Sequence, residues 1–124
     1  MRDLIDRYLA AYNRMDVPAM LDTMHAGVVF ENYTKGVLSV RTQGVAELRH
    51  LAESSLHLFS ARRQIITAFR EHGGDAATAD ILFDGTFAID LPNGVRAGQT
   101  IALTGRSEYR VSEGKLVYIA DFSE

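Results

Sequence analysis

The two halves of the sequence have different periodicity, and this division limits the fold more than any other feature. Helical patterns are confined to the residues before 60, and every later segment is typical of strands and turns. The predicted strands are residues 61–71, 76–90, 95–111 and 115–122. The turns between them are Gly73-Gly74-Asp75, Pro92-Asn93-Gly94 and Glu113-Gly114. Such short connections predict an antiparallel meander.

The N-terminal segment predicts a helix over residues 3–14, followed by a short second helix. The apolar residues of the first helix fall within an arc of ~140° at 100° per residue, and they are Leu4, Ile5, Tyr8, Leu9, Tyr12 and Met15. Asp16 is expected to be the N-cap of the second helix, which Val17-Pro18 opens. One face of the first helix should therefore be buried.

A third helix and two strands complete the first half. Residues 28–33 are rich in β-branched and aromatic side chains and predict a strand, with a return strand over 37–41. The third helix is predicted over residues 45–59, and its apolar face is Leu48, Leu51, Ala52, Ser55 and Phe59. Its histidines, His50 and His57, should point outward to solvent.

These elements predict a single α+β domain over residues 1–124, in which about six strands form a strongly curved antiparallel sheet against three N-terminal helices. Three helices are few for a sheet of that size. A bent sheet over few helices leaves a hollow at its open end, and such a hollow is the usual place for a small-molecule ligand.

Composition excludes several classes of function. The net charge is −3 and the densest basic patch is Arg62-Arg63, whereas nucleic-acid binding needs a basic stripe. The absence of cysteine excludes disulfides and thiolate chemistry, which fits a cytoplasmic protein. No apolar run approaches ~18 residues, so no membrane span is expected. No phosphate loop or metal-ligand spacing is found, and no cofactor or metal is expected.

Five short segments carry a resemblance to a known family. They are Arg7 to Asn13, Asp16 to Met20, Phe30-Glu31-Asn32, Gly44 to Arg49, and Gly114 to Val117. In this order they resemble the nuclear transport factor 2-like superfamily, and within it the SnoaL-like polyketide cyclases and ketosteroid isomerases. The resemblance covers essentially the whole chain and implies a cone-shaped sheet around a pocket. It identifies a scaffold that hosts enzymes, binding proteins and adaptors.

The resemblance also implies candidate site residues. Tyr8, Asn32 and Ser107 stand where ketosteroid isomerases have the oxyanion-hole tyrosine, the catalytic aspartate and a protonated aspartic acid. Because only the tyrosine is kept, steroid isomerisation by that machinery is not expected. The general-base aspartate of the cyclases falls on Asp121, which would abstract a proton while Tyr8 and Asn32 orient the ligand oxygen.

Further residues are expected to contact the ligand from the pocket wall. They are Tyr12, Leu51, Ser55, Leu103, Ser107, Tyr109 and Ile119. The alternation along residues 100–111 places Leu103, Ser107 and Tyr109 on one face of their strand. The strand over 76–90 leaves open whether Asp80 and Asp84 face the pocket or the solvent.

The last strand has a second apolar row opposite Val117, Ile119 and Asp121. Its members are Leu116, Tyr118, Ala120 and Phe122, and they predict a homodimer through the outer face of the sheet.

The sequence thus predicts a pocket for a small, apolar, oxygen-bearing molecule. One hypothesis is cofactor-free proton transfer of the isomerase or cyclase type on a carbonyl compound. The alternatives are a binding protein without catalysis and an adaptor that binds another protein, so the sequence leaves enzymatic activity open.

Overall fold

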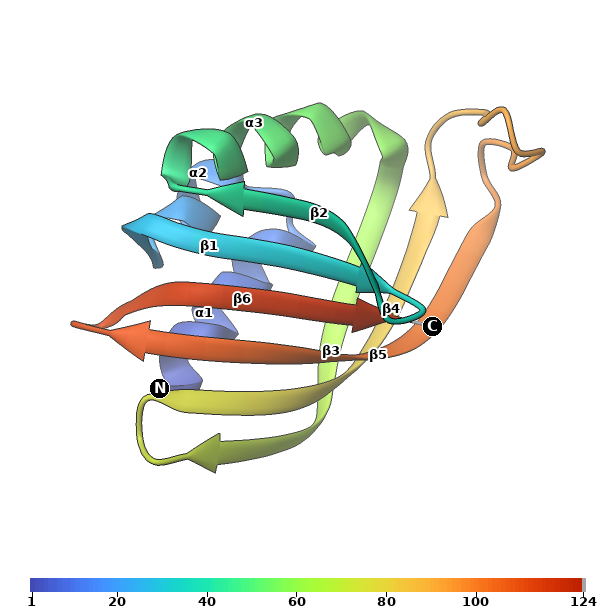
Figure 1. The fold of residues 1–124 in the computed structure, drawn as a ribbon. Coiled ribbons are helices and arrows are strands. Elements are labelled where there is room, and N and C mark those ends of the chain that lie inside the picture. Colours follow the sequence, from blue (N-terminus) through green and yellow to red (C-terminus); the bar gives the residue numbers. More distant parts are fainter. Residues whose placement is uncertain (124) are drawn as a thin grey trace.

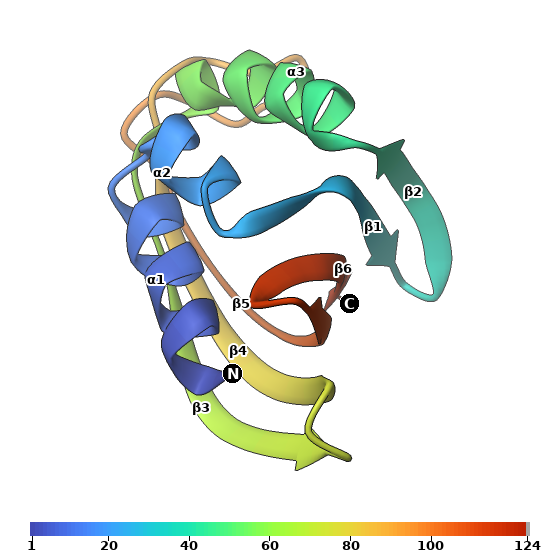
Figure 2. The ribbon, with the colours of Figure 1, turned by 90° about the vertical axis from the view of Figure 1, so that its left-hand side faces the viewer.

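A single six-stranded sheet curves around a long helix in the computed structural model, which describes residues 1–123 (Figure 1). The elements are α1 (Arg2–Asn13), α2 (Val17–Leu21), β1 (Met24–Thr34), β2 (Val37–Gln43), α3 (Val45–Ser55), the 3₁₀ turn η1 (Leu56–Leu58), β3 (Phe59–His72), β4 (Ala76–Phe87), β5 (Thr100–Ser112) and β6 (Lys115–Ser123). Figure 2 shows the bend of the sheet, with α1 along one side and α3 above β1 and β2. The predicted α+β architecture is confirmed, and the sheet does not close into a barrel.

The strand order is β2-β1-β6-β5-β4-β3, so the last strand lies in the middle of the sheet. Strands β3 to β6 form the expected antiparallel meander. β1 and β6 pair in parallel. The chain crosses through α3 and η1 to the far edge of the sheet at β3, and the meander from β3 to β6 then brings it back beside β1. This pairing places Asn32 opposite Asp121, although 89 positions separate them in the sequence.

The core lies between α1 and the face of the sheet that α1 covers, called here the inner face. The buried residues of α1 are Leu4, Ile5, Tyr8, Leu9 and Ala11, in agreement with most of the predicted arc. They pack with inner-face side chains that include Tyr109 and Ile119. Tyr12, at the last turn of the helix, is half-buried and leaves room beside it.

The C-terminal end of α1 is fastened to the edge strand β3. The Asn13 side chain accepts a hydrogen bond from the Gln64 backbone N–H at 2.8 Å and donates to the Gln64 carbonyl at 3.1 Å. The Arg62 Nε donates to the Tyr12 carbonyl at 3.0 Å. These bonds satisfy backbone groups on a free sheet edge and at a helix end, where α1 lacks a basic residue of its own.

Several boundaries differ from the prediction. β1 begins at Met24 rather than at residue 28. α3 ends at Ser55 rather than at residue 59, because the chain continues there as the 3₁₀ turn η1. β4 ends at Phe87 and β5 begins at Thr100, so the predicted strand ends at 90 and 95 are wrong. Within the intervening residues the chain forms turns, as in the bond from Leu91 N–H to the Val95 carbonyl at 2.8 Å, and Gly98 N–H donates back to the Phe87 carbonyl at 2.8 Å.

The apolar row expected on the outer face of the last strand loses one of its members, Leu116, to the core. The register shifts after Arg110, which pairs Val111 with Leu116 and turns Leu116 into the core, where it is fully buried. Farther along the strand, the Tyr118 hydroxyl donates to the Glu31 carboxylate at 2.6 Å. The Tyr33 hydroxyl donates to the same carboxylate at 3.1 Å. The outer face is therefore more polar than expected, and the homodimer through it stays a prediction.

Gly105 lies where the backbone of β6 passes very close to β5, and it also lines the cavity described below. A Cβ at this position would clash with the backbone carbonyl of Phe122, which cannot rotate away. We expect Gly105→Ala to lower the free energy of unfolding by about 1–3 kcal/mol in urea denaturation. Gly27→Ala is the matched control, because a Cβ there meets only the His25 ring at 3.6 Å and should change stability by less than about 0.5 kcal/mol. Equal stability of the two variants would contradict this account.

Candidate functional site

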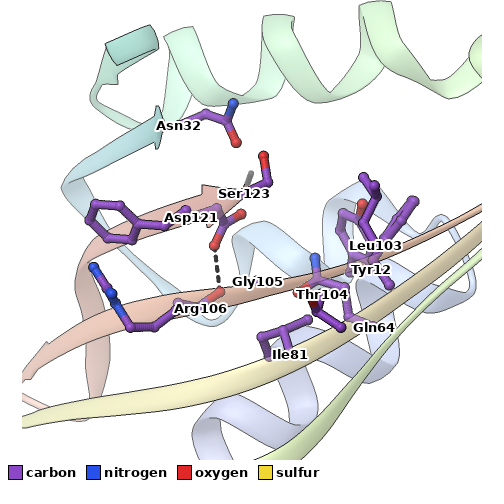
Figure 3. A pocket seen from close by; sticks show the side chains of 13 residues that line it. Tyr12, Asn32, Gln64, Ile81, Leu103, Thr104, Gly105, Arg106, Asp121 and Ser123 are labelled. Carbon is purple, nitrogen blue, oxygen red and sulfur yellow. Dashed lines mark hydrogen bonds between the residues drawn. The ribbon is translucent and has the colours of Figure 1, made fainter. Parts of the chain in front are cut away.

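A cavity of about 200 Å³ opens between the inner face of the sheet and the end of α1 (Figure 3). Its apolar wall includes Ile81, Phe83 and Leu103. Its polar side chains include Tyr12, Asn32, Gln64, Ser107, Asp121 and Ser123. This hollow combines a largely apolar wall with a few convergent polar groups, the usual form of a small-molecule site.

Three cavity residues form a row across neighbouring strands. Asn32 on β1 pairs with Asp121 on β6, and Asp121 pairs with Ser107 on β5. Paired residues of adjacent strands point to the same face of a sheet, so this row follows from the register. The Ser107 hydroxyl donates to Asp121 Oδ1 at 2.7 Å (Figure 3).

Burial raises the pKa of the Asp121 carboxyl from 3.8 to about 6, and the Ser107 hydrogen bond opposes part of this rise. Desolvation disfavours the charged form, while a donor stabilises it. A carboxylate with a pKa near 6 is mostly ionised at neutral pH and is more basic than an ordinary aspartate. This combination suits a general base.

The Asn32 amide has a fixed orientation. The single hydroxyl hydrogen of Ser39 goes to the Asn32 backbone carbonyl at 2.9 Å. The Ser39 oxygen must therefore accept from Asn32 Nδ2, which lies 2.8 Å away. The amide oxygen is left on the cavity side, where Figure 3 shows it facing Ser123. Asn32 consequently presents an acceptor beside Asp121.

Among the residues proposed from the sequence, the structure brings Asp121, Asn32, Tyr12, Leu103 and Ser107 together in the cavity wall. Other candidates lie in the packed core rather than in that wall, and they are Tyr8, Tyr109 and Ile119. Burial, and after it the charge of Asp121, raises the pKa of both the Tyr8 and Tyr109 phenols. The two tyrosines are therefore within electrostatic reach of Asp121.

The helix α3 candidates lie away from the cavity. Leu51 lines a separate depression together with Thr42 and His50, and the Ser55 hydroxyl donates to the Leu51 carbonyl within its own helix at 2.9 Å. Leu48 is the buried residue of this helix. α3 packs against β1 and β2, and no residue of Val45–Ser55 is among those that line the cavity.

Gln64, Ser123, Ile81 and Phe83 line the cavity but were not proposed from the sequence. Ser123 could have been found, because it is two residues beyond Asp121 and strand periodicity places both on one face. Gln64 faces the cavity because β3 pairs with β4 in a register that sets Gln64 beside Phe83, and this register depends on strands that are distant in the sequence.

Of the other charged residues, Arg106 also lines the cavity, and its Nε lies 3.7 Å from Glu108 Oε1. Asp80 and Asp84 face outward and pair with Arg70 at 3.4 Å and Arg63 at 3.3 Å. His50 and His57 are exposed, as predicted. Within residues 1–123 no cluster of three His, Cys, Asp or Glu could hold a metal ion. No helix in the same range has the length and apolarity needed to span a membrane.

Comparison with known proteins identifies the class. The model of the SnoaL-like domain family matches residues 5–119, and the chain belongs to this family. No curated protein matches the sequence.

Solved structures share the fold over nearly the whole chain. A candidate polyketide cyclase from Xanthomonas campestris pv. campestris is similar with a TM-score of 0.80 and 20% identity, covering 99% of this chain and 89% of that one. An NTF2-like protein of unknown function from Burkholderia pseudomallei gives 0.80 and 17%, covering 99% and 89%. An LEH-like epoxide hydrolase from M. tuberculosis gives 0.77 and 13%, covering 98% and 80%. At these identities the likeness shows the fold alone.

The raised pKa of Asp121 predicts an unusual dependence of stability on pH. The folded state binds this proton more tightly than the unfolded chain, so the resulting stabilisation is fully present below about pH 4 and is lost as the pH rises through about 6. Asp121→Asn removes the charge, and it should be more stable than the parent by about 2 kcal/mol at pH 8 and nearly equal to it at pH 4. Urea denaturation at both pH values measures this. The outward-facing Asp80→Asn is the control and should show no gain at pH 8, whereas destabilisation of Asp121→Asn at pH 8 would contradict the account.

Proposed function

We propose that this protein is a cofactor-independent enzyme that transfers a proton within a small carbonyl compound. The observation that carries the proposal is the Asp121 carboxylate, held by Ser107 at 2.7 Å in a cavity with a largely apolar wall. Membership of the SnoaL-like family is consistent with such chemistry but does not specify it.

In the proposed reaction, a free oxygen of Asp121 takes a proton from the carbon next to the substrate carbonyl. The C–H bond breaks, its electron pair moves toward the carbonyl oxygen, and an enolate or enol forms. Return of the proton to a different carbon gives an isomer. Asp121 is the base in the first step and the acid in the second.

The carbonyl oxygen needs a donor near Asp121, because negative charge develops on it. Ser123 meets this requirement, since its hydroxyl lines the cavity two residues farther along the same face of β6. Tyr8, which the sequence suggested for this role, lies in the core and acts in the proposal as a neighbour of Asp121. Asn32 presents its amide oxygen and suits a hydroxyl or enol group of the substrate.

The test is deuterium incorporation next to the carbonyl of small cyclic ketones in D₂O, followed by proton NMR. We expect exchange that rises as the pH passes through about 6, because Asp121 must lose its proton to act as a base. Asp121→Asn keeps the shape of the site and should reduce the exchange by about 10²–10⁴-fold. Asp84→Asn, paired with Arg63 on the outer face, should behave as the parent. Equal exchange by Asp121→Asn and the parent would refute the proposal and favour a binding protein without catalysis.

A second candidate function is supported by the acceptor pair of Asp121 and Asn32. Their oxygens could accept both hydrogens of one water molecule, which Asp121 would then deprotonate for attack on a substrate. Such water activation would suit hydrolysis of a small epoxide, and an LEH-like epoxide hydrolase is among the structurally similar proteins. Gain of one ¹⁸O atom from labelled water by a small epoxide, lost in Asp121→Asn, would favour this reaction over isomerisation.

A further inference from the structure

The cavity has a second polar end that the proposed proton transfer does not use. Tyr12 from α1 and Gln64 from β3 form this Tyr12 end, while Asp121, Asn32 and Ser123 form the Asp121 end. Figure 3 shows the two groups on different sides of the hollow. The apolar side chains Ile81, Phe83 and Leu103 complete the wall.

The Tyr12 end is built as a hydrogen-bond donor. The Gln64 backbone is held by Asn13 on both its N–H and its carbonyl, at 2.8 Å and 3.1 Å, and Gln64 is 9% exposed. Its side chain lines the cavity with Tyr12 and, after Arg62, opposes the rise in the Tyr12 pKa that burial causes. Since the Tyr12 side chain lines the cavity, its O–H is available to a ligand.

A positive charge lies directly behind this donor. The Arg62 guanidinium carbon is 3.7 Å from the centre of the Tyr12 ring, and Arg62 is 9% exposed. Within residues 1–123, the Arg62 guanidinium has no carboxylate within 4.0 Å, although six other arginines form such ion pairs. The Tyr12 end therefore favours an oxygen that carries partial negative charge, whereas the Asp121 end holds a base.

The volume of the cavity indicates the size of the part of a ligand that lies between the two ends. A protein cavity of about 150 Å³ accommodates benzene. The 200 Å³ found here suits a compound slightly larger than one six-membered ring.

We propose that the substrate is a compound of about one ring with two oxygen functions at opposite ends. One is the carbonyl whose neighbouring C–H faces Asp121, and the other is an acceptor oxygen that receives the Tyr12 hydroxyl hydrogen. The inference rests on the proposed function for the Asp121 end, but the contact at the Tyr12 end can be measured independently of catalysis.

The test compares cyclohexane-1,4-dione with cyclohexanone by ligand-observed NMR titration. The dione should bind about tenfold more tightly to the parent protein, because it makes one additional hydrogen bond worth about 1.4 kcal/mol. Tyr12→Phe removes the donor and keeps the ring, so the preference should fall to about twofold. Gln64→Met should also weaken the preference, while Gln43→Met, an exposed glutamine at the end of β2, should leave it unchanged.

Equal binding of the two probes to the parent, a preference that survives in Tyr12→Phe, or no binding of either probe at millimolar concentration would overturn the inference. Deuterium exchange separates it from the proposed function. A preference without exchange refutes the proton transfer alone, and exchange without a preference refutes the two-ended substrate alone.

Discussion

The burial of one carboxylate beside a serine hydroxyl is the interaction on which the site depends. Asp121 is held on the inner face of the sheet, and within the described residues Ser107 is the side chain that donates to it. This single donor stabilises the anion less than desolvation destabilises it, so the pKa of Asp121 rises to about 6. A second or third donor would have produced an ordinary structural aspartate. The position of β6 in the middle of the sheet is what brings this carboxylate to the cavity, because Asn32 and Ser107 then flank it from neighbouring strands.

The hydrogen bonds that join the end of α1 to β3 also shape the side of the cavity that lies away from Asp121. Asn13 and Arg62 connect the last turn of α1 to β3 and satisfy polar groups that would otherwise be exposed at a helix end and a sheet edge. As a consequence, Tyr12 and Gln64 are fixed where a ligand can reach them. The cavity therefore has two different ends. Hydrogen bonds between α1 and β3 fix Tyr12 and Gln64 at one end, and the Asp121 carboxylate of raised pKa lies at the other.

Much of this arrangement could be predicted from the sequence, because it depends on local periodicity. The alternation along β5 predicted the facing of Leu103 and Ser107, and the helical arc predicted the burial of Tyr8. The errors have a physical cause in each case. A register shift after Arg110, which periodicity does not reveal, turned Leu116 into the core. Residues 88–99 form turns, with bonds such as Leu91 N–H to the Val95 carbonyl and Ala97 N–H to the Asp90 carboxylate, rather than extending two strands. The place of Gln64 in the cavity wall depends on the pairing of β3 with β4, which sets Gln64 beside Phe83, and such pairing between strands has no local pattern.

The most direct measurement of the central claim is the titration of the Asp121 carboxyl carbon by ¹³C NMR, with the signal assigned by its absence in Asp121→Asn. The account predicts a midpoint near pH 6, because burial with a single side-chain donor disfavours the charged form. A midpoint near 3.9, the ordinary value for an aspartate, would show that water reaches the carboxylate freely and would contradict its role as a base of raised pKa.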